Sequence, residues 1–383
     1  MLKYLQGDRT IWLIVLVLSL FSILAVYSAT GSLAFRQTGG DTEYYFFKQL
    51  LLVGVGLLVM YGAHIINYTY YSRIAQLLLY ISIPLLLFTL AFGSDINDAS
   101  RWLKLPILNI SFQTSDFAKL ALIMYTARML SKKRDIIKDF DRGFVPIIAP
   151  ILVVCMLVLP ANLSTAAVLF FTCMVLMFIG RVSTRHLLLT VWIGISVVLL
   201  FLSTAYMSGY KGRIETWKSR IVNFWKGNDQ DEHYQVQHAK IAIVSGGLVR
   251  LAPGKSQQQH FLPQPYSDYI YAIIIEEYGL LGGAVIMFLY LAFLFRCIKI
   301  FTRSPGAFGA FLAVGLGVSL VIQAIMNMAV TVDLLPVTGL TLPLVSMGGT
   351  SVLFSSVSIG IILSVSRNIE QQEKDVLMRS GVV

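Results

Sequence analysis

The stretch Phe261-Leu-Pro-Gln-Pro-Tyr-Ser-Asp-Tyr-Ile-Tyr-Ala-Ile-Ile-Ile-Glu-Glu-Tyr-Gly-Leu-Leu-Gly-Gly283 joins the end of a long polar segment to a strongly apolar one. Asp268 lies where the polar part ends, and Glu276 and Glu277 follow about two helical turns further along. Carboxylates beside an apolar segment of this length are costly and therefore indicate a function or a specific partner.

The composition of the whole chain shows what that apolar segment is. Hydrophobic residues make up 56% of the 383 residues, only 13% are charged, and the mean hydropathy is +0.74. A soluble domain could not bury so much apolar surface, so we predict an all-α integral membrane protein in which residues 1–383 form one domain.

The residues with metal-binding or redox chemistry form no pattern. The three cysteines all fall in or at the ends of apolar segments, and the five histidines lack ligand spacing. The formal net charge is +10, which in a membrane protein is an orientation signal and does not indicate a nucleic-acid partner.

Segments of about 20 apolar residues predict transmembrane helices. We expect ten of them, at residues 11–29, 47–66, 74–93, 116–130, 144–159, 165–180, 187–206, 269–295, 308–330 and 350–366.

Ten spans place both termini on one side of the membrane. If that side is the cytoplasm, its segments hold seventeen Lys and Arg residues and the short outer loops hold four. This bias follows the positive-inside rule and places the long loop at residues 207–268 outside.

The long loop contains two predicted helices. Residues 211–226 carry apolar side chains on one face and cations at its margins, which is typical of a helix lying in the membrane interface. Residues 234–244 are expected to form a second helix, which ends at Gly246 and Gly247.

Asp268 has two interpretations from its local sequence. An aspartate before an apolar run is an ordinary helix N-cap. A carboxylate at the outer face of the membrane could also act as a general base, and the two roles can coexist.

Lys119 is a cation within the fourth predicted span. Snorkelling to the interface is the simple explanation, but an intramembrane cation facing the bundle interior is by default a functional residue. Asp268, Glu276 or Glu277 are its expected partners, whereas Asp116 is expected to cap its helix and to interact with the helix dipole.

Other outer residues suit binding or packing. Arg101, Arg213 and Arg220 could bind an anionic substrate or simply lipid, because arginine binds phosphate bidentately. Trp102 fits an aromatic belt at the interface, and Asn327 in the ninth span fits an interhelical hydrogen bond.

Several motifs in order give the chain a family resemblance. These are Ala99-Ser-Arg-Trp-Leu103, Gln113-Thr-Ser-Asp-Phe-Ala-Lys119, Pro160-Ala-Asn-Leu-Ser-Thr165, Tyr234-Gln-Val-Gln-His238, Ser245-Gly-Gly-Leu248 and Leu335-Pro-Val-Thr-Gly-Leu-Thr-Leu-Pro-Leu-Val-Ser346. Together with the 261–283 stretch they resemble the SEDS family, the RodA, FtsW and SpoVE-like proteins of bacterial cell-wall synthesis.

The resemblance implies an inverting peptidoglycan glycosyltransferase in the bacterial cytoplasmic membrane. The implied substrate is lipid II, a disaccharide-pentapeptide on undecaprenyl pyrophosphate, and the implied partner is a class B penicillin-binding protein among the divisome or elongasome proteins. The family's catalytic aspartate falls on Asp268. Substrate-binding positions fall on Lys119, Arg101, Trp102, Arg213, Arg220, Gln235 and Gln237. Asp116, Glu276, Glu277 and Asn327 are expected to support them.

The chain departs from the family pattern at Gln264, where a glutamate is usual. This leaves Asp268 as the only local base and weakens a two-carboxylate site for a divalent cation such as Mg²⁺ or Mn²⁺. Gln264 and the Asn162-Leu-Ser-Thr165 sequence are more similar to an FtsW branch than to RodA, which favours a role in cell division.

Two other functions remain open at this point. The polar residues of the spans could line a path for flipping lipid II across the membrane, and the chain could be a scaffold that recruits a penicillin-binding protein. In the enzymatic reading, Asp268 would deprotonate a sugar hydroxyl, and cations or a metal ion would stabilise the pyrophosphate leaving group.

Overall fold

The computed structural model describes residues 6–38, 41–95, 100–105, 110–207 and 230–379. The described residues fall into two compact units. Unit 1 is drawn from Met1–Ile66, Arg220–Lys299 and Leu320–Val383, and unit 2 from Asn67–Ser219 and Ile300–Ser319.

The regular elements among the described residues of unit 1 are all helices. The unit contains α1 (Arg9–Ala29), α2 (Gly31–Thr38), α3 (Thr42–Ile65), α10 (Gln230–Gly246), the short helix η3 (Gln258–His260), most of α11 (Ile270–Arg303), the end of α12 (Ala307–Thr331) and α13 (Gly349–Arg379).

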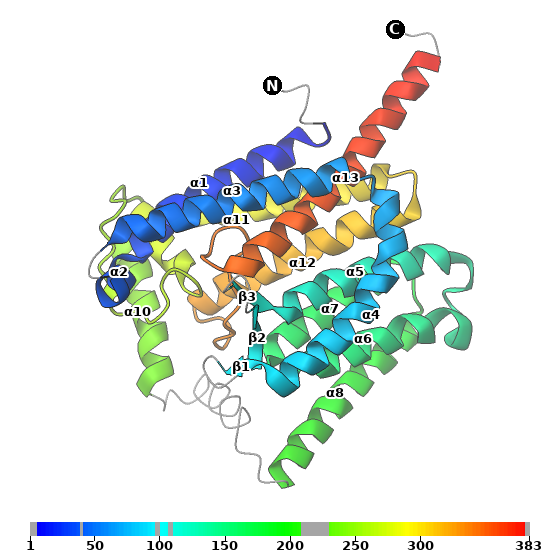
Figure 1. The fold of residues 1–383 in the computed structure, drawn as a ribbon, viewed down its shortest axis with the longest axis horizontal. Coiled ribbons are helices and arrows are strands. Elements are labelled where there is room, and N and C mark those ends of the chain that lie inside the picture. The colour runs from blue at the N-terminus through cyan, green and yellow to red at the C-terminus, as the bar shows by residue number, and fades with distance from the viewer. Residues whose placement is uncertain (1–5, 39–40, 96–99, 106–109, 208–229, 380–383) are drawn as a thin grey trace. The chain divides into compact units, whose positions relative to one another are not determined.

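Small residues bring α3 and α13 together, and Figure 1 shows α1, α3 and α13 running alongside one another. A Cβ atom at Gly56 of α3 would lie 2.9 Å from the Ser356 hydroxyl oxygen of α13. A Cβ atom at Gly360 of α13 would lie 2.4 Å from the carbonyl oxygen of Met60. Glycine at these two positions therefore lets the helices approach closely, as is common between membrane helices.

Two contacts between α1 and α11 mark the two ends of this helix pair. Asp8 caps α1 by accepting hydrogen bonds from the Thr10 and Ile11 amides, and it also binds Arg296 of α11, with an Nε–Oδ2 distance of 2.7 Å. At the other end, the Ser28 hydroxyl of α1 donates to Glu277 of α11. Twenty residues of helix from Asp8 to Ser28 span about 30 Å, the thickness of a bilayer's hydrocarbon core.

The two contacts therefore bracket one hydrocarbon thickness within unit 1. Gly7 and Glu370 are hydrogen-bonded at 2.9 Å, so the described N-terminal residues and the end of α13 lie together at the Asp8 end. That the two termini share one side of the membrane stays a prediction. Asp268 precedes α11 and lies beyond Glu277, at the opposite end.

We expect Arg296→Met to lower the free energy of unfolding by about 3 kcal/mol, because the Asp8 carboxylate would stay buried without its cation. Thermal unfolding of the purified protein in detergent measures this change. Adding Asp8→Asn should recover much of the loss, because asparagine keeps the helix cap without the charge. Arg303→Met, at an exposed position of the same helix, is the control. Equal unfolding temperatures for Arg296→Met and the control would contradict the prediction.

Unit 2 combines helices with a small sheet. It contains α4 (Tyr68–Phe92), β1 (Ser94–Asp95), β2 (Ser100–Leu105), β3 (Ile110–Gln113), α5 (Thr114–Lys132), η1 (Arg134–Ile136), η2 (Phe140–Phe144), α6 (Val145–Val158), α7 (Leu163–Ile179), α8 (Thr184–Met207) and the start of α12.

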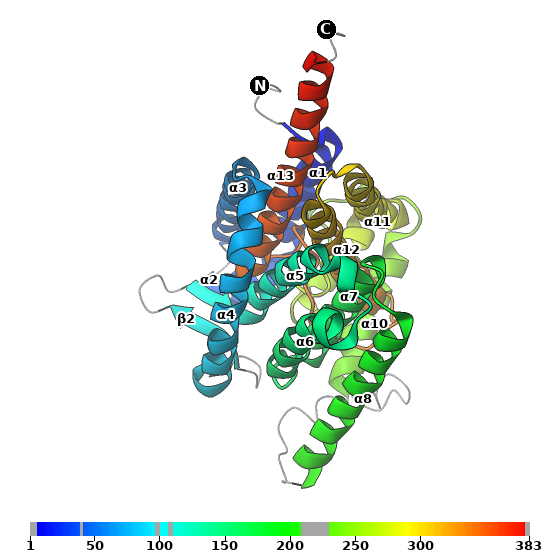
Figure 2. The ribbon, with the colours of Figure 1, turned by 90° about the vertical axis from the view of Figure 1, so that its right-hand side faces the viewer.

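The sheet corrects the all-α prediction. The strands pair antiparallel in the order β1-β2-β3, and β2 lies beside α4 (Figure 2). The chain between α4 and α5 was expected to be a simple loop because its strands are short and their apolar pattern is weak. Backbone pairing between the strands, which local sequence does not report, stabilises them.

Each of the ten predicted spans coincides with a helix, with ends shifted by several residues. Among the described residues, seven helices are long and apolar enough to cross a membrane. The helices α5, α7 and α8 are not among these seven, and α7 and the Thr184–Leu200 part of α8 are shorter apolar helices. The second loop helix, predicted at residues 234–244, is also present as α10.

Candidate functional site

Asp268 lies in the irregular segment that leads into α11. The helix begins at Ile270, which places Tyr269, and not Asp268, in the N-cap position. The Asp268 side chain is partly exposed, and its Oδ1 atom accepts a hydrogen bond from the Ser267 hydroxyl at 3.0 Å. The carboxylate is thus oriented by a neighbour while part of it stays accessible.

Residues of α12 and of the segment that follows it hold the backbone of the Asp268 segment. Asn327 donates from Nδ2 to the Asp268 carbonyl at 2.9 Å and to the Leu340 carbonyl at 2.7 Å. The Ser346 hydroxyl donates to the Ser267 carbonyl at 2.6 Å. These contacts clamp the segment from outside its own helix. Asn327 was expected to bond another helix, but it binds loop carbonyls instead. Ser346 ends the Leu335–Ser346 motif, but its contact with the Asp268 segment was not predicted because a motif does not report which distant segment a hydroxyl binds.

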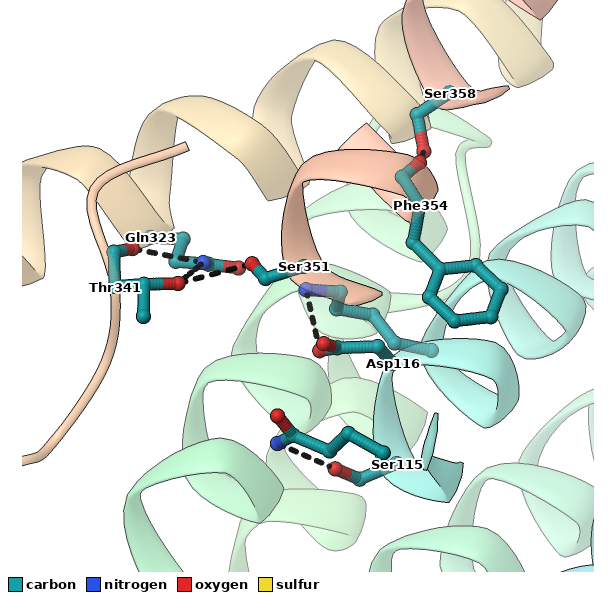
Figure 3. Close-up of polar contacts among 9 residues, drawn as sticks. Ser115, Asp116, Gln323, Thr341, Ser351, Phe354 and Ser358 are labelled. Atoms are coloured by element: carbon teal, nitrogen blue, oxygen red, sulfur yellow. Dashed lines mark hydrogen bonds and ion pairs between the residues drawn. The ribbon is translucent and has the colours of Figure 1, made fainter. Parts of the chain in front are cut away.

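A second side chain of α12 supports the same returning segment. Gln323 donates to the Thr341 carbonyl at 2.9 Å, and the Thr341 and Ser351 hydroxyls are hydrogen-bonded at 2.9 Å. Figure 3 shows these three side chains in one cluster. Gln323 therefore binds the segment one helical turn before Asn327, but away from the Asp268 carbonyl.

Glycine leaves space beside the Asp268 carboxylate. Gly339 has φ +65°, a left-handed conformation that favours glycine. A Cβ atom at this position would lie 3.7 Å from Asp268 Oδ2. A larger side chain at position 339 would therefore contact the carboxylate, which glycine leaves open.

Tyr266, in the same segment, is partly buried and lies near Tyr45 and the Asp268 carboxylate. Burial, then the neighbouring Tyr45 and Asp268, raises the pKa of the Tyr266 hydroxyl above its usual value of 10.0. The Tyr266 carbonyl accepts a hydrogen bond from the Met347 amide at 2.9 Å. Tyr266 thus stays a neutral group between the Asp268 segment and the segment that follows α12.

Glu276 and Glu277 are buried in α11 and hold the preceding loop. Glu276 accepts from the Ser256 hydroxyl at 2.5 Å and from the Gln257 amide at 2.8 Å. Glu277 accepts from the Gly254 amide at 3.0 Å as well as from Ser28. The described contacts therefore give both carboxylates backbone and hydroxyl partners.

We expect Glu276→Gln to lower the free energy of unfolding by about 1–3 kcal/mol. Glutamine replaces one accepting oxygen with an NH₂ group that faces hydrogen-bond donors from residues 256–258. Thermal unfolding in detergent measures the loss, and Glu373→Gln at an exposed position of α13 is the control. A Glu276→Gln protein as stable as the control would show that this carboxylate does not hold the loop.

Helix α10 contributes polar side chains to the loop before Asp268. Tyr269 donates to Gln235 at 3.5 Å, and His238 is hydrogen-bonded to Gln258 at 2.7 Å. The His238 ring also stacks on Phe261, with ring centroids 4.9 Å apart. Gln235 thus lies next to the start of α11, while the nearby Gln237 is exposed.

Unit 2 holds the other described site residues. Lys119 Nζ lies 3.4 Å from Oδ1 of Asp116, which is in the first turn of α5, so its observed partner is the residue that was expected only to cap the helix. The other oxygen, Asp116 Oδ2, is buried and has no hydrogen-bond partner among the described residues. Asp116 is therefore a buried carboxylate with one remaining accepting oxygen.

The sheet links two motifs that are separated in the sequence. Trp102 on β2 pairs with Gln113 on β3, directly before α5. Arg101 precedes Trp102 on the same strand. The backbone around Arg101 and Trp102 therefore lies beside the start of the helix that carries Asp116. Arg213, Arg220 and the helix predicted at residues 211–226 lie outside the described residues.

A metal site in a protein needs several ligand side chains held close together. Among the described residues, no group of three or more His, Cys, Asp or Glu side chains is arranged to hold a metal ion.

Comparison with known sequences places the chain among related proteins along nearly its whole length. The FtsW, RodA and SpoVE family, described as cell cycle protein, matches residues 8–371. The chain is 33% identical to stage V sporulation protein E of Bacillus subtilis over 371 residues, which covers 95% of this chain and 98% of that protein. It is 31% identical to a probable peptidoglycan glycosyltransferase FtsW of Trichlorobacter lovleyi, covering 95% of this chain and 94% of that protein.

Solved structures show the same fold. A chain from a structure on the coordination of polymerization and crosslinking by a peptidoglycan synthase complex matches with a TM-score of 0.74 and 24% identity, covering 95% of this chain and 99% of that one. The crystal structure of the Thermus thermophilus rod shape determining protein RodA matches with a TM-score of 0.68 and 24% identity, covering 94% of this chain and 97% of that one.

Proposed function

This chain belongs to the FtsW, RodA and SpoVE family, and on that basis we propose that it is a peptidoglycan glycosyltransferase. It polymerises lipid II into β-1,4-linked glycan strands at the outer face of the bacterial cytoplasmic membrane. Its relatives named FtsW support a role in cell division.

The observation that carries the proposal is the position of Asp268. Helix α11 runs about 10 Å from Glu277 back to Ile270, and Asp268 lies just before Ile270. Because Glu277 marks one end of the hydrocarbon thickness in unit 1, Asp268 lies at the level of lipid headgroups. The phosphates and first sugar of a membrane-bound lipid occupy this level.

Asp268 acts as the general base. It takes the proton from the 4-hydroxyl of the acceptor sugar as that oxygen bonds to the anomeric carbon of the donor. The bond from the anomeric carbon to the pyrophosphate oxygen breaks at the same time, and the lipid pyrophosphate leaves with the electron pair. Direct displacement inverts the α-linked donor to a β linkage.

Cations stabilise the departing pyrophosphate. By the family resemblance, Lys119, Arg101, Arg213 and Arg220 supply positive charge to the developing anion. Trp102, Gln235 and Gln237 contribute to binding of the sugar and lipid. Asp116 keeps Lys119 oriented through their ion pair.

The proposed topology has ten spans and cytoplasmic termini. Within the described part of the chain, seven apolar helices meet the length and composition of a span, and α5, α7 and α8 are proposed as the other three. The Lys and Arg bias supports cytoplasmic termini, which puts Asp268 outside because it lies at the opposite end of unit 1.

A class B penicillin-binding protein is the proposed partner. The solved peptidoglycan synthase complex contains a chain of this fold. A transpeptidase beside the polymerase would crosslink the glycan as it is made, within the divisome.

The test is to incubate fluorescent lipid II with the purified protein and its partner transpeptidase, and to separate the products by gel electrophoresis. The proposal predicts long glycan polymers whose formation requires this chain. Transport of lipid II across vesicle membranes without polymer would instead identify a flippase. Polymer formation that needs the partner's catalytic residues, but none in this chain, would identify a scaffold.

A further inference from the structure

The last turn of α10 and the segment that follows it expose a cluster of aliphatic side chains. Leu251 is 83% exposed, Val244 79%, Leu248 75% and Val249 66%. Four large aliphatic side chains within eight residues, all exposed this far, form an apolar surface that needs a nonaqueous environment.

Backbone hydrogen bonds attach this segment to one short stretch of α11. The Leu280 amide donates to the Gly247 carbonyl at 2.9 Å, and the Leu281 amide donates to the Leu248 carbonyl at 3.2 Å. The Ala252 amide donates to the Glu277 carbonyl at 3.0 Å. Residues 247–252 therefore run beside residues 277–281 of the helix.

Gly279 makes this close attachment possible. Its φ of +72° interrupts the helical conformation of α11. A Cβ atom at this position would lie 2.7 Å from the Leu248 carbonyl oxygen, which is too close for any other residue without rearrangement. The kink also frees the amides of Leu280 and Leu281 to bind the segment.

The two contacts between α1 and α11, Asp8 with Arg296 and Ser28 with Glu277, indicate how deep in the membrane this attachment lies. Glu277 lies about one hydrocarbon thickness along α11 from Arg296. Leu280 and Leu281, which follow the kink, are themselves 45% and 56% exposed on a helix long and apolar enough to span the membrane. The aliphatic cluster is therefore continuous with the lipid-facing surface of α11 at the edge of the hydrocarbon core.

We propose that residues 244–251 form a membrane-inserted loop, whose four aliphatic side chains enter the outer edge of the lipid hydrocarbon next to Gly279. Two of its backbone carbonyls, those of Gly247 and Leu248, accept hydrogen bonds from α11, which lowers the cost of placing them at the edge of the hydrocarbon. This loop is distinct from the interfacial helix predicted at residues 211–226.

The loop couples the membrane surface to the Asp268 segment. The Glu276 and Glu277 side chains hold residues 254–258, which directly follow the loop. The same helix begins two residues after Asp268. An inserted loop would thus fix the height of α11, and of Asp268, relative to the lipid headgroups. The inference concerns membrane depth and does not depend on the reaction.

Site-directed spin labelling of the full chain in liposomes tests this loop. A nitroxide is attached at Leu248→Cys or Leu251→Cys, and its collisions with oxygen, which partitions into lipid, and with a water-soluble nickel chelate are measured. Phe288→Cys, 72% exposed on α11, is the lipid-facing control, and Lys255→Cys, an exposed polar position, is the aqueous control. The parent protein, whose three cysteines are buried, is the blank for labelling.

We expect the oxygen-to-nickel accessibility ratio at positions 248 and 251 to exceed that at position 255 at least about threefold, with a depth of about 5–10 Å below the headgroups. Ratios equal to that of Lys255→Cys would overturn the proposal, because the loop would lie in water. Shielding from both reagents would also overturn it, because protein would then cover the loop. A protein that fails to insert into the liposomes is recognised because the nitroxide at Phe288→Cys would then lose the high oxygen accessibility of a lipid-facing position.

Discussion

Asp268→Asn is expected to lower the rate of glycan polymerisation by about 10²–10⁴-fold, which is the usual contribution of a general base. An amide has nearly the shape of a carboxylate but cannot take the proton of the attacking hydroxyl. Its oxygen can still accept the hydrogen bond from Ser267, so the segment should keep its conformation. The loss would therefore be chemical and not structural.

The measurement is the initial rate of polymer formation from labelled lipid II, with the variant in complex with its partner transpeptidase. Asp333→Asn is the matched control, because Asp333 is also a carboxylate of unit 1, and its ion pair with Lys240 is partly exposed. Breaking such a surface pair costs little. If Asp268→Asn kept a rate close to that of Asp333→Asn, Asp268 could not be the base.

Asn327→Leu is expected to lower the polymerisation rate by about 10²-fold through a shift of Asp268, because small displacements of reacting groups have effects of this size. Leucine has a similar volume but cannot donate hydrogen bonds. The carbonyls of Asp268 and Leu340 would lose their shared donor. Stability should also fall by about 1–3 kcal/mol, because buried acceptors are left unpaired.

Gln323→Leu separates positioning from folding. Gln323 lies one turn earlier on α12 and binds the carbonyl of Thr341 in the same returning segment, whereas Asn327 binds the carbonyl of Asp268 itself. We expect the two variants to have similar unfolding temperatures and very different polymerisation rates. If the two rates fell together, in proportion to stability, Asn327 would have only a structural role.

Much of the helical architecture was predictable because hydropathy is a local property. Each predicted span lies on a helix, and α10 follows the pattern seen at residues 234–244. The sheet was not predictable, because β2 and β3 are stabilised by pairing with each other and by packing on α4. Strands this short carry little signal of their own.

The candidate site also has one part that the sequence predicted and another that it did not. Asp268 was recognisable because a carboxylate at the boundary between a polar loop and an apolar helix is energetically costly and therefore indicates a function. The clamp around it was not, because Asn327 reaches the Asp268 carbonyl across 59 residues and Ser346 reaches Ser267 across 79. The ion pair of Lys119 with Asp116 was also missed, since a helix-start carboxylate is ordinarily a dipole partner.

By itself, the sequence determined that the chain is a helical membrane protein of a known family and that Asp268 is its best candidate base. Apolar length, charge bias and motif order are readable along the chain without knowledge of contacts. Only the tertiary structure decided which end of unit 1 the Asp268 segment occupies and which residues hold it. Those properties arise from contacts such as Asp8 with Arg296, Ser28 with Glu277, and Asn327 with Asp268, which form only when distant segments pack together.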